Sequence, residues 1–197
     1  AGMTLSIEHG FPHHIAQCMV WRGWALAGEG QIESGLSLLR EGVARYRQTE
    51  SLSLVALFLA ALGEAAGRAG KLQEGHDAVV EALSIVARTE ERCIEPELHR
   101  LQGGLFRLLC QEQDAEACLH RAITIAREQG AKLWELRAVT SLARLWRDQG
   151  KRGEALDVLA PIYNWFTEGL DTPVLKEAKA LLEELSDSPF VISARPA

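Results

Sequence analysis

Arginine side chains recur in the second half of the chain at a spacing that suits a binding surface. Arg100 and Arg107 are seven residues apart, and so are Arg137 and Arg144. Residues at this spacing lie on one stripe of an α-helix, because two turns take up about seven residues. Guanidinium groups bind carboxylates and phosphates through paired hydrogen bonds. Two such stripes side by side would form a basic patch for an acidic peptide or an anionic ligand.

The alternative is that these arginines are neutralised by acidic residues of the same chain. Glu97, Glu135 and Asp148 are the candidate partners in the sequence. Exposed ion pairs of this kind are common and individually weak. The stripes would then form a solvated face that binds nothing, and both interpretations stay open at this point.

Histidines and cysteines offer little for metal binding or catalysis. His14 and Cys18 are four residues apart on one predicted helix face, but two ligands make a poor metal site. Cys110 and Cys118 flank a predicted turn, and the absence of a CxxC pair is typical of reduced thiols. Sequence motifs of metalloproteases, serine hydrolases, calcium loops and phosphate-binding loops are missing. We therefore expect no enzyme activity, no catalytic residue, no metal and no cofactor.

The composition is that of a folded globular domain. The chain has 197 residues, of which 47% are hydrophobic and 24% charged, and this excludes wholesale disorder. The formal net charge of -6 argues against nucleic acid as a partner. The longest uncharged apolar stretch, 52–63, is much shorter than the about 20 residues that cross a bilayer. The first residues lack the pattern of a signal peptide, so we expect a cytoplasmic protein without a membrane partner.

Small residues recur every forty positions, which indicates an internal repeat. Two helices approach closely only where side chains are small, and glycine ends a helix by taking a positive φ. Each forty-residue unit is therefore predicted to be a helical hairpin. The columns are Gly23, Gly63, Gly103 and Ala143; Gly35, Gly75, Ala115 and Ala155; Gly42, Ala82 and Ala122; and, at the hairpin turns, Gly30, Gly70, Cys110 and Gly150.

Apolar periodicity places eight helices in four hairpins and a ninth after them. Pro161 should kink or break the eighth helix, and the apolar stripe of the ninth predicts a capping helix. A weak strand signal occurs only at Phe190, Val191 and Ile192, so the predicted fold is an all-α solenoid. The expected helices are 11–28, 31–47, 51–69, 72–88, 95–110, 114–129, 132–149, 152–167 and 173–185.

The columns of small residues resemble those of the tetratricopeptide repeat (TPR). The resemblance covers about 11–167, with units six residues longer than the family's usual length of about 34. The stretch from Trp134 to Leu185 is similar to the C-terminal end of large bacterial signalling regulators, which carry adenylate/guanylate cyclase-like or winged-helix modules and an ATPase ahead of such repeats. The expected organisation is an N-terminal extension or cloning remnant at 1–10, four TPR-like hairpins at 11–167, a capping helix at 168–186 and an irregular tail at 187–197.

The resemblance implies that the first helix of each hairpin lines a concave groove that holds a partner protein or peptide. The family's asparagine clamp for a C-terminal carboxylate is missing, because Asn164 is the only asparagine. We expect an acidic partner, or upstream domains of the parent chain. The alternatives are a sensor for an anionic metabolite and a module that forms homodimers. The groove residues carried over from the family are Trp24, Glu64, Arg100, Arg107, Arg137, Arg144 and Arg147.

Overall fold

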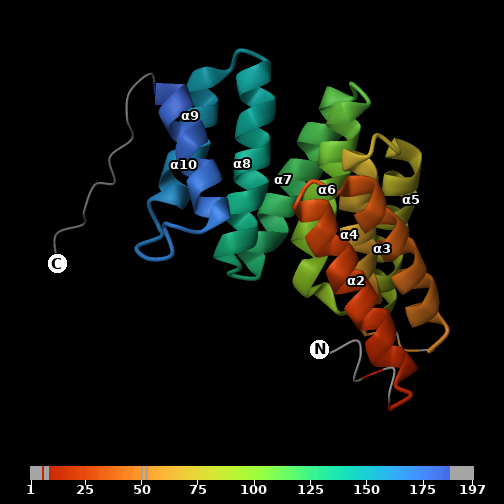
Figure 1. Ribbon diagram of the computed structural model, residues 1–197. Coiled ribbons are helices and arrows are strands. Elements are labelled where there is room, and N and C mark those ends of the chain that lie inside the picture. The colour runs from red at the N-terminus through yellow and green to blue at the C-terminus, as the bar shows by residue number, and fades with distance from the viewer. Residues whose placement is uncertain (1–5, 7–8, 50, 52, 187–197) are drawn as a thin grey trace.

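The computed structural model describes residues 6, 9–49, 51 and 53–186, and its α-helices follow one another in antiparallel hairpins (Figure 1). Within these residues no strand occurs, and the predicted strand signal at 190–192 lies outside them. None of the described helices is long and apolar enough to cross a membrane. The helices are α2 (Pro12–Gly28), α3 (Ile32–Arg47), α4 (Val55–Arg68), α5 (Leu72–Thr89), α6 (Glu95–Leu108), α7 (Glu112–Glu128), α8 (Lys132–Asp148), α9 (Arg152–Tyr163) and α10 (Pro173–Ser186), with a short 3-10 turn, η1 (Arg92–Ile94), before α6.

The hairpins stack in chain order, from the red α2 to the blue α10 in Figure 1. Within each hairpin the two helices pack closely, as α2 does with α3 and α8 with α9. The first helices also contact one another along the stack, in the order α2, α4, α6, α8 and α10. Helix α10 thus takes the position of a first helix after the fourth hairpin. This row of alternate helices provides one continuous surface.

Glycines at the helix crossings allow the backbones of each hairpin to touch. A methyl group at Gly35 would lie 2.5 Å from the carbonyl oxygen of Gly23 and 2.6 Å from the backbone nitrogen of Ala27. A methyl group at Gly103 would lie 3.0 Å from the carbonyl oxygen of Ala115. These columns are therefore small because the neighbouring helix leaves no room for a larger side chain.

The hairpin turns repeat one backbone conformation. Gly30, Gly70 and Gly150 have φ values of 89°, 74° and 77°, and Cys110 takes the same left-handed conformation at 58° without being a glycine. A second series, which was not predicted from the sequence, precedes the first helix of a hairpin. Gly10, Glu90 and Gly130 are spaced by multiples of forty and have φ values of 66°, 61° and 65°.

Several helix ends differ from the predicted ones for local reasons. Helix α4 begins at Val55 rather than 51, because Leu54 has a φ of 64° and cannot continue a helix. Helix α6 ends at Leu108 rather than 110, because Cys110 is left-handed. Helix α9 ends at Tyr163 rather than 167, two residues after Pro161, and the expected break therefore takes the form of an early end.

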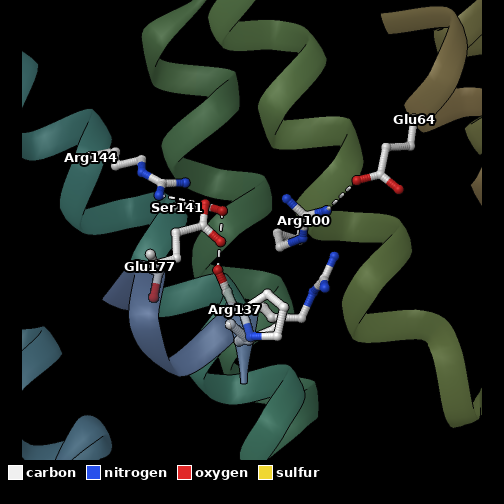
Figure 2. Close-up of a pocket in the computed structure, with 9 residues that line it drawn as sticks. Glu64, Arg100, Arg137, Ser141, Arg144 and Glu177 are labelled. Atoms are coloured by element: carbon white, nitrogen blue, oxygen red, sulfur yellow. Dashed lines mark hydrogen bonds and ion pairs between the residues drawn. The ribbon is translucent and has the colours of Figure 1, made fainter. Parts of the chain in front are cut away.

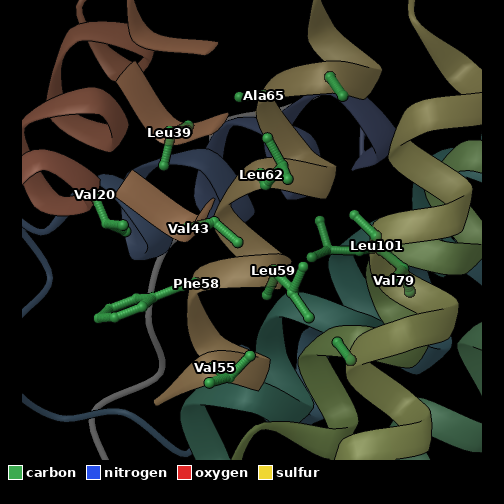
Figure 3. Close-up of a cluster of buried hydrophobic side chains, with 14 of the residues drawn as sticks. Val20, Leu39, Val43, Val55, Phe58, Leu59, Leu62, Ala65, Val79 and Leu101 are labelled. Carbon is green, nitrogen blue, oxygen red and sulfur yellow. The ribbon is translucent and has the colours of Figure 1, made fainter. Parts of the chain in front are cut away.

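The apolar core consists of two clusters. The first extends from Ala16 in α2 to Leu105 in α6, and the second extends from Ala115 in α7 to Leu185 in α10. Figure 3 shows the first cluster, in which Leu59 and Leu62 of α4 lie between Val43 of α3 and Leu101 of α6. The second cluster includes the apolar face of α10, which is buried as predicted for a capping helix.

Candidate functional site

A cavity of about 240 Å³ opens on the row of first helices (Figure 2). Four alternate helices, α4, α6, α8 and α10, contribute its walls. The wall contains three arginines and two glutamates, with a small apolar area from the start of α10. The lining residues are Glu64, Arg100, Arg137, Thr140, Ser141, Arg144, Pro173, Val174 and Glu177.

Beside the cavity, one buried carboxylate joins two guanidinium groups. Arg100 donates to Glu97 through Nε at 2.8 Å and Nη2 at 2.7 Å. Arg137 donates to the same carboxylate through Nε at 3.2 Å and Nη2 at 2.7 Å. Glu97 is only 8% exposed, so water contributes little to its solvation. Burial by itself would raise the pKa of Glu97, but the charges and hydrogen bonds of Arg100 and Arg137 outweigh it and hold this pKa below its ordinary value.

Two further carboxylates face the cavity from opposite sides, as Figure 2 shows. Glu64 of α4 approaches Nη2 of Arg100 only to 3.9 Å, a distance too long for a hydrogen bond. Glu177 of α10 accepts a hydrogen bond of 2.5 Å from Nη2 of Arg144. Glu64 is thus the carboxylate of this cavity with the weakest internal partner.

The hydroxyl groups of the cavity are already bonded to their own helix. Thr140 donates to the carbonyl oxygen of Leu136 at 2.7 Å, and Ser141 donates to that of Arg137 at 3.1 Å. Their oxygens can accept a hydrogen bond from a ligand but have no second proton to donate. The arginines are therefore the side-chain donors that line the cavity.

The structure brings four of the seven predicted groove residues to one cavity: Glu64, Arg100, Arg137 and Arg144. Arg107 lies in an adjoining depression of about 200 Å³ that shares Glu64 and Arg100 with the cavity. Its Nη1 atom donates to Asp148 at 3.0 Å. Arg147 is held by Asp148 at 2.8 Å and by Glu184 at 3.1 Å.

Trp24 lies far along the stack, on α2, and does not line the cavity. Its side chain is half exposed and packs edge-on against Trp21, with ring centroids 6.2 Å apart. Trp21 in turn contacts the buried Phe58. The seven predicted residues therefore divide into a charged group on α4 to α8 and an aromatic position on α2.

Internal neutralisation of the arginines is extensive. Of the three acidic partners considered from the sequence, Glu97 and Asp148 bind arginines of the predicted stripes. Glu135 instead binds Arg127 and Lys132, at 2.7 and 2.8 Å. The surface is therefore mixed in charge rather than simply basic.

Sequence reasoning missed the contribution of α10, although the signal was present. Glu97, Arg137 and Glu177 are forty residues apart and hold the same register on α6, α8 and α10. The same spacing relates Arg144 to Glu184. Extending the columns into the ninth helix would have placed acidic side chains beside the arginines.

The remaining candidates do not form a second site. Cys18, Cys93, Cys110 and Cys118 are all free thiols. Cys118 contacts Gln102, and burial raises the pKa of its thiol. Among the described residues, no group of three or more metal-ligating side chains is placed to hold a metal ion.

Stacked hairpins with small residues at the crossings define an α-solenoid of the TPR-like class, and comparison with solved structures supports this class. A Podosopora anserina protein with nearly identical TPR-like repeats, described as a kinesin light chain, is 18% identical with a TM-score of 0.65 over 89% of this chain and 87% of that one. BtubC (BKLC) from P. vanneervenii is 15% identical with a TM-score of 0.73 over 94% and 79%. The predicted TPR-like fold is thereby confirmed.

Sequence comparison gives a bacterial relative of greater length. An uncharacterized protein of Rhizobium meliloti (strain 1021) is 28% identical over 130 residues, which is 66% of this chain. The chain spans only 13% of that relative's length. No protein-family model matches the sequence.

Proposed function

We propose that this protein is a non-enzymatic interaction module that binds an acidic partner segment along α4, α6, α8 and α10. The observation that carries the proposal is the cavity itself, because four alternate helices of the stack share its walls. A surface built from successive repeats can contact an extended segment over several hairpins. TPR-like folds generally act as scaffolds for such interactions.

The charges on this surface favour an acidic segment over a basic one. Arg100 and Arg137 share the single carboxylate of Glu97, and the second positive charge is faced only by Glu64, at 3.9 Å from Arg100. Arg144 is engaged through one nitrogen only, by a Glu177 side chain that is 52% exposed. A carboxylate of the partner can replace Glu177 at small cost, since exposed ion pairs contribute little.

We place this module in the C-terminal part of a longer bacterial signalling regulator. The much greater length of the Rhizobium meliloti relative supports the view that this chain is one domain of a longer protein. The resemblance of Trp134–Leu185 to bacterial signalling regulators supports the view that this longer protein is such a regulator. Upstream domains of the same parent are candidate partners, in the cytoplasm. The partner segment would then be acidic and present in the parent chain.

Selection from a random peptide display library tests the interaction. Selected peptides would be measured by fluorescence anisotropy against the wild type and against Arg107→Glu/Arg144→Glu. The matched control is Arg40→Glu/Arg47→Glu, because these two arginines also form one interhelical pair each, with Glu74 and Glu81, but on the second helices of the hairpins. Circular dichroism would establish equal helicity in all three proteins.

The expected result is a set of acidic peptides whose affinity falls at least about tenfold in the first double variant and little in the control. An equal loss in both variants would assign the binding to overall charge rather than to this surface. Failure to select any peptide, or selection of peptides that bind all variants alike, would contradict the proposal.

A further inference from the structure

We propose that the cavity binds a small zwitterion, specifically a free aliphatic α-amino acid. The cavity presents groups of both charges to a space of about 240 Å³, which is below the usual size of sites for drug-sized ligands. The ligand carboxylate would lie between Arg137 and Arg144, and its ammonium group would lie against Glu64. This site goes beyond the proposed peptide interaction and does not depend on it.

Charge balance favours a ligand that is neutral overall. Three guanidinium groups, those of Arg100, Arg137 and Arg144, face three carboxylates, those of Glu64, Glu97 and Glu177. A zwitterion adds one charge of each sign and preserves this balance. A simple anion would keep this balance only by displacing Glu177 from Arg144.

The donors for a carboxylate are grouped at the α8 and α10 side. Arg137 uses Nε and Nη2 for Glu97 and lies over the ring of Trp134 at 5.6 Å, and among the described residues its Nη1 donates no hydrogen bond. Arg144 uses Nη2 for Glu177, so its Nε and Nη1 are likewise available. At the first turn of α10, Pro173 has no N–H group, so this turn adds the backbone N–H of Val174 and the positive end of the helix dipole.

Glu64 supplies the acceptor for an ammonium group on the opposite side. Its side chain is one-third exposed, and its contact with Arg100 at 3.9 Å leaves the carboxylate oxygens without a hydrogen bond in the described structure. The side chains of Pro173 and Val174 provide the apolar part of the wall. An ammonium group on Glu64, a carboxylate near Arg144 and an apolar side chain against Val174 are the features of an aliphatic amino acid.

A peptide does not meet these requirements in the same way. Its terminal ammonium and carboxylate groups lie at opposite ends of the chain, and each end brings one charge only. A free amino acid carries both charges on one carbon atom. A cavity that presents both positive and negative groups therefore suits a free amino acid better than the acidic peptide segment of the proposed function.

Isothermal titration calorimetry of the purified protein tests the site directly. The probes are L-alanine, L-valine, L-leucine and L-isoleucine, with N-acetyl-L-leucine as the form that keeps only the carboxylate and L-leucine amide as the form that keeps only the ammonium. We expect at least one free amino acid to bind, and both capped forms to bind at least about tenfold more weakly.

Two variants locate the binding. Glu64→Gln and Arg144→Gln should each lower the affinity at least about tenfold. Glu74→Gln and Arg40→Gln, which change a similar ion pair on α3 and α5, should leave it unchanged. Thermal unfolding would show that the variants are folded.

Several results would overturn the inference. Equal binding of N-acetyl-L-leucine would define an anion site, and equal binding of the amide would define a cation site. No heat of binding from any probe at about 10 mM would exclude a zwitterion site of useful affinity. Because this titration contains no peptide, its failure would not affect the outcome of the peptide selection.

Discussion

Glu97 and Arg137 lie forty residues apart in the chain and hold the same register on α6 and α8, with Oε1 of Glu97 2.7 Å from Nη2 of Arg137. At the corresponding position of α4 the repeat has the apolar Leu57, and at that of α10 it has Glu177. The same position of the repeat is therefore apolar in the second hairpin and charged in the third and fourth hairpins and in α10. The contact between α6 and α8 therefore includes a buried charge cluster instead of apolar packing alone.

Replacing Glu97 with glutamine should destabilise the protein by about 3 kcal/mol, because two largely buried guanidinium groups would lose their only shared carboxylate. Urea denaturation would measure this loss as a lower unfolding free energy. Glu177→Gln is the control, since its exposed pair with Arg144 should contribute about 1 kcal/mol or less. Equal costs for both substitutions would mean that the buried cluster does not stabilise the fold.

Stability should also fall in acid as Glu97 is protonated. Its pKa lies below the ordinary value of 4.5 in the folded protein, so its contribution is present above pH 4.5 and is lost as the pH falls through the folded value. Urea titrations at several pH values should show a shallower acid dependence for Glu97→Gln. Glu135 has a pKa lowered in the same direction, so part of the slope should remain. If the unfolding free energy depended on pH equally in both proteins, Glu97 would not contribute to the loss of stability in acid.

His99 should act in a different pH window. Partial burial lowers the pKa of His99 below its ordinary value of 6.5, because desolvation penalises the charged ring. The unfolded chain then binds a proton more readily, so stability should begin to fall below pH 6.5, before the carboxylates titrate. His99→Asn should remove this early part of the decline and leave the part below pH 4.5. An unchanged profile near pH 6 would rule out this contribution.

The fold could be predicted because the crossings of helices restrict side-chain size at regular intervals. Gly35→Ala would place a methyl group 2.5 Å from a backbone oxygen of α2 and should cost about 2–3 kcal/mol. Gly104→Ala has open space within 4 Å and should instead stabilise α6 by about 0.5–1 kcal/mol. Urea denaturation of the two variants distinguishes the two kinds of glycine. Gains of similar size in both variants would show that helix propensity, rather than the crossing, sets the effect.

Cys110 occupies a hairpin-turn position that is glycine in the other three hairpins, and this leads to a further prediction. Cys110 has a φ of 58°, a conformation that costs about 1–2 kcal/mol for a residue with a Cβ atom. Cys110→Gly should therefore raise the unfolding free energy by about 1 kcal/mol, while Cys110→Ala should not. A gain of equal size in both variants would point to the thiol, and not to the backbone, as the cause.

The candidate site was harder to predict than the fold. Helical spacing placed Arg137 and Arg144 on one face of a helix, and the resemblance to TPR groove positions put Arg100 on the same surface. The structure brings all three to one cavity. The ion pairs depend on distances between helices, which the sequence pattern does not contain. Arg147 could reach both its neighbour Asp148 and Glu184 on α10, and only the packing of α10 decides that it contacts both.

The division of the apolar core between α6 and α7 also bears on how the protein opens. In the part of the chain that the structure describes, each hairpin packs mainly against its neighbours, so we expect the stack to open in parts rather than all at once. We expect the cluster from Ala16 to Leu105 and the cluster from Ala115 to Leu185 to open with different free energies, while the packing of α6 against α7 joins them. In native-state hydrogen exchange, the slowest amides of α4 and of α8 should report these two openings separately. A ligand held by both α6 and α8 would couple the units and slow exchange in both.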